Sequence, residues 1–359
     1  MMRLIVAICF LFSLIEANEY EFDMDAIETK TYEYSGYIKA SQKHQKTKQN
    51  KTINSYLGEA IVGFDYFVEQ WTLKSQFQAN YYNTDKEEKS TDTINQLYID
   101  YKLSSNNRFD IGKQSLMWGK AYFFNPVAFL DRKKDPNNPE ASKEGYVIAH
   151  YKYNKSYERD LQNFSLDIVY MPTSKDTNDD FLDENSNTIA LKAYFLYLDT
   201  DIDIIYFHND KLDDKFGFDF SKNILTNFEI HGEYAKLDDE NSSSVVGIKY
   251  LTSYDLTITS EYFDRSYRLK KPEPFYDKRY FINKFSLKEP FGMVYSSVYY
   301  KNSLNLLDNS TQNSLGTVYN FKNNIQLDLS YIKNIGEKKS EFGSKNIEDT
   351  ILSKLIWYF

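Results

Sequence analysis

Cysteine, proline and glycine are scarce in this sequence of 359 residues, and each scarcity narrows what the chain can be. The single cysteine is Cys9, and only 7 prolines and 13 glycines occur. Without a second cysteine the chain has no disulfide framework and no metal site built on several thiolates. After the first residues, no apolar stretch continues for the roughly 18 residues that a membrane-spanning helix needs. The single cysteine excludes a disulfide-rich scaffold, and the lack of a long apolar run excludes a helical membrane protein.

The first residues have the pattern of a secretory signal peptide. Arg3 precedes an apolar run from Leu4 to Ile15, and Ala17 precedes the polar Asn18. We expect residues 1–17 to be removed after Ala17, so that the mature chain lacks cysteine. An N-terminal membrane anchor is the alternative, but the apolar run is short for it. Residues 18–30 are acidic, and we expect them to form a short periplasmic segment rather than a plug domain.

Alternation of apolar and polar residues dominates the rest of the chain. Phe164, Leu166 and Ile168 alternate with Ser165 and Asp167, and similar patterns recur up to the C-terminus. An apolar face toward lipid and a polar face toward water is typical of strands in a transmembrane barrel. The barrel must close, because an open sheet edge in lipid leaves backbone groups unpaired. We predict an all-β fold in which residues 31–359 form one transmembrane antiparallel up-and-down β-barrel.

The segments between the predicted strands alternate in length. The pattern gives about 18 strands, and about 16 would also fit it. Short segments alternate with longer, charged ones, as periplasmic turns alternate with external loops in outer-membrane barrels. A soluble secreted β-sandwich or β-helix is the alternative, but neither requires a polar face on every strand.

The last predicted strand ends on an aromatic residue. Ile351, Leu355, Trp357 and Phe359 fall on one face of it. This ending resembles the C-terminal signal by which bacterial outer-membrane proteins are recognised and inserted. We therefore expect the insertion machinery to be a partner through the strand that ends in Phe359. Outer-membrane lipid and lipopolysaccharide are expected to surround the barrel.

Residues 119–143 break the alternation and form the third and longest predicted external loop. The half from Ala121 to Leu130 is apolar and aromatic, and would be costly to leave in water. The half from Asp131 to Glu140 is charged and stiffened by two prolines. We expect the loop to fold into the barrel, where its fixed charges would narrow the pore and focus its electric field. The alternative is that the aromatic half only braces the barrel and the basic tip is exposed at the surface.

Two sets of candidate site residues follow from this arrangement. The constriction candidates lie in the loop or just before it: Lys113, Trp118, Lys120, Tyr122, Phe123, Phe124, Asp131, Arg132, Lys133, Lys134 and Asp135. The lumen-wall candidates lie on polar strand faces: Lys74, Arg108, Asp110, Asp167, Glu229, His231, Glu233 and Glu261. Acidic and basic side chains nearly balance on these faces, which predicts at most a mild preference for cations.

The signal peptide, the alternating strands and the terminal Phe359 together resemble those of Gram-negative outer-membrane porin-like proteins. The segment 112–146 contains Gly-Lys-Gln, Trp-Gly-Lys and Phe-Asn-Pro-Val-Ala-Phe. It is similar to a segment of poorly characterised bacterial outer-membrane barrels related in style to porins and exopolysaccharide-export barrels. General porins fold their third external loop inward, so the resemblance implies the same constriction here. Porin-like barrels often trimerise, so a homo-oligomer is compatible with the resemblance.

We therefore expect a passive outer-membrane channel for small hydrophilic solutes or ions, and not an enzyme. No nucleophile-elbow, zinc-protease or phosphate-loop motif occurs, and no cofactor, metal or nucleic-acid partner is expected. One alternative is an occluded barrel that serves as an export or assembly scaffold with a partner. Another is an outer-membrane hydrolase that uses His231, although a polar lumen wall accounts for the same residue.

Overall fold

The computed structural model describes residues 30–84, 86–266 and 278–359. The expected signal peptide, and all but the last residue of the expected periplasmic segment 18–30, lie outside the described residues. Tyr32–Phe359 form one unit, and its described residues contain strands and a short 3-10 helix, η1 (Pro290–Gly292). None of the helical segments among the described residues is both long and apolar enough to cross a membrane.

Eighteen antiparallel strands form the wall, which confirms the predicted fold class. In chain order the strands are β1 Tyr32–Thr47, β2 Thr52–Val68, β3 Trp71–Thr84, β4 Glu88–Lys102, β5 Asn107–Gln114, β6 Tyr146–Ser156, β7 Leu161–Thr173, β8 Ser186–Tyr197, β9 Thr200–Asn209, β10 Leu212–Leu225, β11 Phe228–Lys236, β12 Ser242–Leu251, β13 Leu256–Ser266, β14 Lys278–Lys288, β15 Ser296–Asn305, β16 Thr311–Asn320, β17 Ile325–Ile335 and β18 Ile347–Tyr358.

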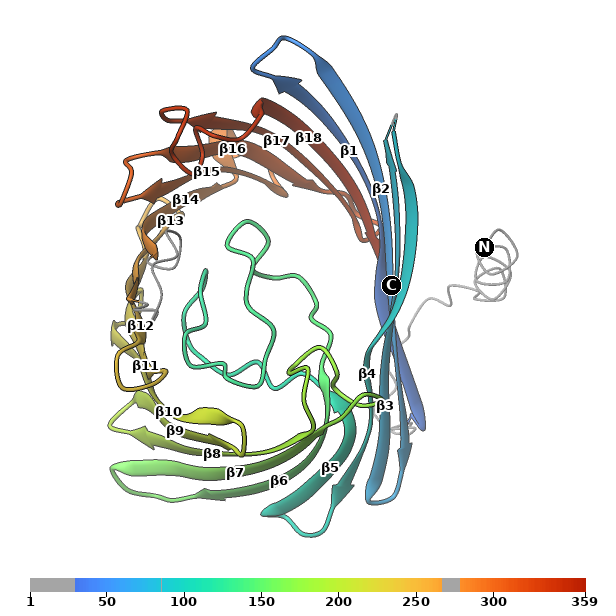
Figure 1. Cartoon of the computed structure of the whole chain (residues 1–359), viewed down its shortest axis with the longest axis vertical. Helices are drawn as coiled ribbons and strands as arrows, with labels where there is room; N and C mark the ends of the chain where they lie inside the picture. Colours follow the sequence, from blue (N-terminus) through green and yellow to red (C-terminus); the bar gives the residue numbers. More distant parts are fainter. Residues whose placement is uncertain (1–29, 85, 267–277) are drawn as a thin grey trace. The chain divides into compact units, whose positions relative to one another are not determined.

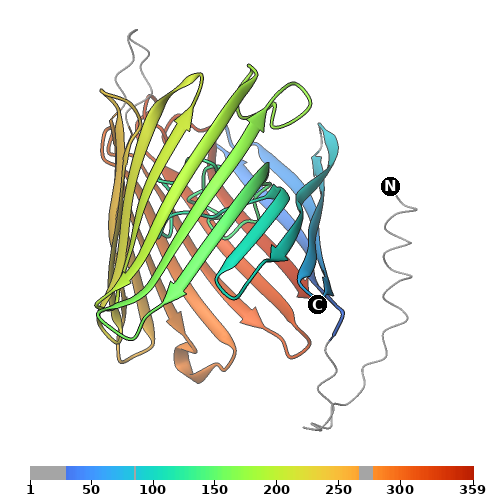
Figure 2. The same cartoon turned by 90° about the horizontal axis from the view of Figure 1, so that it is seen from below.

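The sheet closes on itself where the last strand meets the first. Each strand pairs with its neighbours in the chain, and β1 pairs with β18, where Tyr37 lies opposite Tyr358. The amide of Gly36 donates to the carbonyl of Phe359 across this junction (3.0 Å). Figure 1 shows the resulting ring of strands, and Figure 2 shows their tilt. Closure supplies each strand with a partner on both sides, as a lipid environment demands.

The connections between strands differ at the two ends of the barrel. At one end are tight turns, such as the pair of residues between β2 and β3 and the pair between β8 and β9. At the other end are longer loops, including residues 115–145, 174–185 and 336–346. β1 continues to Thr47, because its backbone pairing with β2 and β18 extends to that residue.

The segment between β5 and β6, residues 115–145, lies inside the ring of strands (Figure 1). We call it the lumen loop. It starts earlier than predicted, because β5 ends at Gln114 and not near Trp118. The Asp131 carboxylate explains this ending, since it accepts the backbone amides of Leu116 (2.9 Å) and Trp118 (3.0 Å). Those amides are therefore not available for pairing within the sheet.

The lumen face of the wall is not polar throughout, which corrects the expectation of a polar face on every strand. Two apolar clusters join the lumen loop to the wall. One combines Trp118, Val127 and Leu130 with residues of β6 to β11, including Phe207. The other combines Phe123 and Phe124 with residues of β12 to β14. The wall is apolar where the loop packs on it, because burial of the aromatic loop requires an apolar surface opposite it.

Candidate functional site

Two carboxylates of the wall hold the first half of the lumen loop. Glu233 on β11 accepts the amide of Ala121 (2.6 Å) and that of Val127 (3.4 Å). Glu261 on β13 accepts the amides of Tyr122 and Phe123, the latter at 3.0 Å. Both carboxylates are almost completely buried, with exposed fractions of 3% and 0%. Hydrogen bonds from amides to buried carboxylates are about twice as strong as those between neutral groups. They fasten the loop to the wall.

Gly119 permits this close approach. Its φ of +104° is in the region that favours glycine, and a Cβ atom there would lie 2.6 Å from Oε1 of Glu233. The chain therefore enters the lumen at a residue that has no side chain to clash with the wall. A larger residue would push the loop away from Glu233.

His231 and Tyr122 extend the same attachment. His231 lies 3.0 Å from Glu261 and 3.3 Å from Glu229. The Tyr122 hydroxyl donates to Glu229 (2.9 Å), and the ammonium of Lys249 lies 4.7 Å from the centre of the Tyr122 ring. His231 has no exposed surface, so its imidazole is closed to solvent. This position suits a residue that orients two carboxylates.

Lys120 pairs with a wall carboxylate on the neighbouring strands. Its ammonium lies 3.1 Å from Asp203 on β9 and 5.1 Å from the centre of the Tyr194 ring on β8. Burial opposes the charge of Lys120, but the carboxylates of Asp203, Asp219 and Asp201 together outweigh burial and raise the pKa of the Lys120 ammonium. The loop thus neutralises part of the wall's acidic charge.

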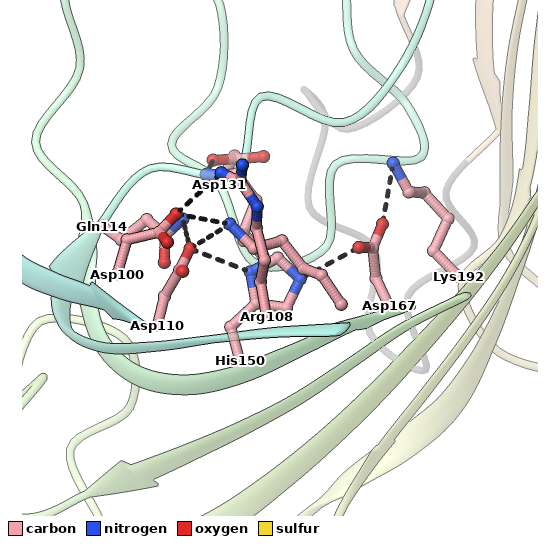
Figure 3. A network of polar contacts seen from close by, with 10 residues as sticks. Asp100, Arg108, Asp110, Gln114, Asp131, His150, Asp167 and Lys192 are labelled. Atoms are coloured by element: carbon pink, nitrogen blue, oxygen red, sulfur yellow. Dashed lines mark hydrogen bonds and ion pairs between the residues drawn. The ribbon is translucent and has the colours of Figure 1, made fainter. Parts of the chain in front are cut away.

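A chain of alternating charges follows the wall from β4 to β8 (Figure 3). Its members are Asp100, Arg108, Asp110, Lys152, His150, Asp167 and Lys192. His150 bridges this chain, since Nε2 lies 3.1 Å from Asp167 and Nδ1 lies 3.9 Å from Asp110. Lys192 then joins Asp167 (3.2 Å) and lies 5.4 Å from the centre of the Trp118 ring. Charges that neutralise one another in this way leave little net field along this part of the wall.

The second half of the lumen loop is fixed by different contacts. Arg132 pairs with Glu144 (3.3 Å) and with Asp180 of the loop between β7 and β8, and it covers the Tyr146 ring at 5.0 Å. On the far side of the lumen, Lys301 of β15 donates to the carbonyl of Pro136. The loop therefore reaches from β5 to the opposite wall.

Between the lumen loop and the wall lies a cavity of about 630 Å³, which we call the outer pocket. Six basic side chains line it: Lys133, Lys134, Lys215, Arg265, Lys278 and Lys345. Lys215 faces aromatic rings, 4.4 Å from the centre of Phe207 and 5.8 Å from that of Phe129. Within the described part of the chain, no carboxylate lies within ion-pair distance of Lys133 or Lys215.

The acidic residues of the outer pocket are largely engaged within the protein. Asp131 accepts loop amides, as described above, and Asp238 accepts the amides of Glu240 and Asn241 (both 2.8 Å). Glu341 accepts the Tyr280 hydroxyl at 2.7 Å. Asp213 is the fourth acidic residue of the lining. Six basic side chains against these four acidic ones give the lining a positive formal charge.

Comparison with known proteins agrees with this architecture. A family model described as phosphate-selective porin O and P matches residues 31–193, which include β1 to β7 and the lumen loop. No curated protein sequence matches the chain. Among solved structures, OpdQ of Pseudomonas aeruginosa has a TM-score of 0.59 at 8% identity, over 92% of this chain and 99% of that one.

Two further structures have the same fold. OccAB1 of Acinetobacter baumannii gives a TM-score of 0.60 at 8% identity, over 91% of this chain and 96% of that one. Wzi of Escherichia coli, a carbohydrate-binding β-barrel involved in group 1 capsule assembly, gives 0.60 at 12% identity, over 92% and 84%. The chain has the fold of these porin-like β-barrels, and residues 31–193 resemble the phosphate-selective porin O and P family.

The predicted constriction residues of this porin-like barrel separate into three groups. Trp118, Phe123 and Phe124 are buried and pack the lumen loop against the wall. Lys120, Tyr122, Asp131, Arg132 and Lys134 hold the loop through the contacts above or, for Lys134, through a bond to the carbonyl of Ala121. Lys133 lines the outer pocket, while the exposed Asp135 accepts the amide of Asn137 (2.9 Å).

Lys113 is the exception and requires a correction. It lies opposite Leu97 and Val147, whose side chains are exposed on the outward face of the barrel, and it pairs with Glu144. The even-numbered neighbours Asp110 and Gln114 are buried and linked to each other by a hydrogen bond. Alternation along β5 thus places Lys113 outside the lumen, away from any constriction.

The predicted wall residues lie on the lumen side, where Lys74 pairs with Asp65 (3.6 Å) and the others form the contacts described above. Sequence reasoning missed the side chains that complete the site: Glu144, Lys192, Lys215, Arg265, Lys278 and Lys301. A signal existed for some of them. Lys192, for instance, has the parity of the polar face within its predicted strand.

Proposed function

We propose that this barrel is a passive channel for small hydrophilic solutes, with the lumen loop as its constriction. The observation that carries the proposal is the attachment of the loop across the lumen. Its amides are held by Glu233 and Glu261, and its tip is held by Lys301. A loop fixed at both places keeps a constant cross-section, which a size-selective channel needs.

We further propose that the channel prefers anions. The charges along the wall nearly cancel, but six basic and only four acidic side chains line the outer pocket. Fixed charge at the narrow part of a pore has more influence than charge elsewhere on the wall, because the low-dielectric surroundings focus its field. The name of the matching family model, phosphate-selective porin, supports the same direction. This preference differs from the mild cation preference predicted from the strand faces.

Planar bilayers reconstituted with the folded barrel test both statements. We expect discrete conductance steps, and a reversal potential in a potassium chloride gradient that has the sign of chloride preference. Deletion of residues 121–140 should raise the single-channel conductance, because it removes the segment that crosses the lumen. Folded material without any conductance would refute the channel, and an unchanged conductance after the deletion would refute the constriction.

A second candidate function is an occluded barrel that acts as an export or assembly scaffold. The two apolar clusters between loop and wall favour it, since such packing suits a plug as well as a constriction. The capsule-assembly protein Wzi has the same fold. A scaffold should co-purify with a periplasmic or surface component and should give no conductance steps. The closed position of His231 gives no support to a hydrolase.

A further inference from the structure

We propose that a proton is bound between Asp203 and Asp219, where the lumen loop meets the wall, and that its loss at alkaline pH loosens the loop. The proton site does not depend on the proposed channel. Its effect on conductance does rest on that proposed function, so the two are tested by separate measurements. Three observations support the site: the register of the acidic side chains, their lack of hydrogen-bond donors and the small number of cations beside them.

Acidic side chains form a row across three neighbouring strands, which we call the acidic row. Asp219 of β10 lies directly opposite Asp203 of β9 on one side and Glu233 of β11 on the other. Directly opposite side chains have Cβ atoms about 4.5–5.5 Å apart, and like charges at such positions are destabilising. All three are buried, with exposed fractions of 2% for Asp203, 0% for Asp219 and 3% for Glu233. Solvent therefore does not screen their repulsion.

The central carboxyl group of the acidic row lacks the hydrogen-bond donors that a buried carboxylate needs. Neither Oδ1 nor Oδ2 of Asp219 has a hydrogen-bond partner among the described residues, and the same holds for Oδ1 of Asp203. Glu233, in contrast, accepts the amides of Ala121 and Val127. Burial of an ionised group without donors is costly, whereas a neutral carboxylic acid costs less and can itself donate to a neighbouring carboxylate. Asp219 is therefore the residue that best accommodates the proton.

Lys120 of the lumen loop is the cation that pairs with the acidic row. Its ammonium lies 3.1 Å from Oδ2 of Asp203, and among the described residues it alone lies within ion-pair distance of the row. Lys134, a second ammonium of the loop, is bonded to a loop carbonyl. If Asp203, Asp219 and Glu233 were all ionised, the row would keep two uncompensated negative charges in a buried place, which is strongly unfavourable. One proton halves that excess.

Other ionisable groups on the adjacent strands do not supply the missing positive charge. Asp201 of β9 accepts the hydroxyl of Tyr194 and adds a further acidic group. His231 of β11 lies between Glu229 (3.3 Å) and Glu261 (3.0 Å), so it pairs with carboxylates outside the acidic row. Within the described ranges of the chain, no three carboxylate, imidazole or thiol side chains are arranged to hold a metal ion. A proton is therefore the ligand that suits the row.

The acidic row lies at the place where the lumen loop is attached to the wall. Gly119 approaches Glu233 so closely that a Cβ atom would lie 2.6 Å from Oε1, and Lys120 contacts Asp203. When Asp219 loses its proton, the new charge must be hydrated, and water reaches the buried row only if the loop moves away from the wall. The bound proton therefore keeps the loop in place, and alkaline pH should loosen it.

Infrared spectroscopy of the full barrel in detergent tests the proton site independently of conductance. Near neutral pH the wild type should show the carbonyl stretching band of a protonated carboxyl group, shifted in heavy water. Asp219→Asn should lose this band, because a neutral amide replaces the acid. Asp203→Asn should lose it too, since Asp219 would then ionise beside Lys120. The second variant also decides the question if Asp219→Asn does not fold.

The matched control is Asp328→Asn. Asp328 on β17 is also a nearly buried lumen aspartate, but it has donors of its own, because Lys354 donates at 2.9 Å and Tyr299 at 3.2 Å. The control should therefore keep the infrared band. A band that survives both row substitutions, or one that the control loses equally, would overturn the proposal. A missing band in the wild type, with an unfolding temperature that depends on potassium concentration, would show that a metal cation occupies the row instead.

Planar bilayer recording measures the consequence for the loop. From neutral pH to about pH 9, below the ordinary lysine value of about 10.4, transitions to higher conductance should become up to about tenfold more frequent per pH unit in the wild type. This is the factor by which the ionised fraction of one group grows while it is small. Asp219→Asn should show no such increase, and an equal increase in both would refute the link between proton and loop. The infrared band without any conductance would refute the channel and leave the proton site standing.

Discussion

Removal of the two wall carboxylates that hold the lumen loop should open the channel. We consider the double substitution Glu233→Ala and Glu261→Ala. Four backbone amides lose their acceptors, those of Ala121, Val127, Tyr122 and Phe123. These amides would then be either unpaired among apolar side chains or hydrated, and hydration requires the loop to leave the wall.

The size of the effect follows from the number of bonds. A hydrogen bond to a charged group contributes about 1.5–3 kcal/mol, so four of them contribute about 6 kcal/mol at the lower bound. A change of about 5.5 kcal/mol moves a two-state equilibrium from roughly 1:99 to 99:1. The apolar clusters around Trp118 and Phe124 remain in the variant and resist displacement of the loop. We therefore expect the double variant to have a larger mean conductance than the wild type. We also expect frequent, brief transitions to a state of still higher conductance, in which the loop has left the wall.

Single-channel recording in planar bilayers measures this directly. The matched control is Glu59→Ala, because Glu59 on β2 is also a partly buried lumen carboxylate. Its contacts in the described residues are with Tyr37, Lys39 and Gln78 of the wall, and not with the lumen loop. Conductance and open-channel noise equal to those of the Glu59→Ala control would show that the carboxylates do not hold the constriction.

Three further perturbations are predicted. Gly119→Ala, which places a Cβ atom 2.6 Å from Oε1 of Glu233, should raise the conductance in the same direction as Glu233→Ala but by less, and unaltered single-channel steps would contradict this. The pKa of Lys133 is lowered by burial and by neighbouring cations, so its charge is lost as the pH rises toward the ordinary lysine value of about 10.4. Anion preference, measured as the reversal potential, should accordingly decline over this range in the wild type and less in Lys133→Gln. Phe359→Ala keeps the backbone bonds to Gly36 and should lower the amount of barrel inserted in cells while refolding in detergent stays unchanged, and equal insertion in cells would refute a role for the terminal ring.

The barrel itself could be predicted from the sequence because lipid imposes a strict rule. Each strand must face lipid with every second residue, so alternation such as Phe164, Leu166 and Ile168 is preserved wherever the chain crosses the membrane. The inward loop was also predictable in outline, because ten successive residues rich in aromatic side chains are not stable in water. What alternation does not determine is which residue of the wall meets which residue of the loop.

The positions where alternation fails show which part of the wall the lumen loop covers. The run Ile204, Ile205, Tyr206 and Phe207 is apolar at both parities, and in the structure Ile205 and Phe207 face the lumen loop while Ile204 and Tyr206 are exposed on the outside. Val147 and Ile148 on β6 show the same duplication. Apolar residues at both parities within a barrel strand therefore indicate a wall covered on its inner side. The end of β5 was misjudged for a different reason, since it depends on Asp131, which is distant in sequence from the amides it accepts.

The way in which the loop is held also explains how one barrel type can acquire different solute preferences. Glu233 and Glu261 accept hydrogen bonds from backbone amides, and almost every residue type supplies such an amide. Loop side chains that neither pack on the wall nor bond to it are therefore free to change without releasing the loop, provided that Gly119 stays small. Lys133 is such a residue, and it borders the outer pocket. Substitutions of Lys133 should alter which solute binds before they alter the conductance, whereas substitutions at Gly119 should do the reverse.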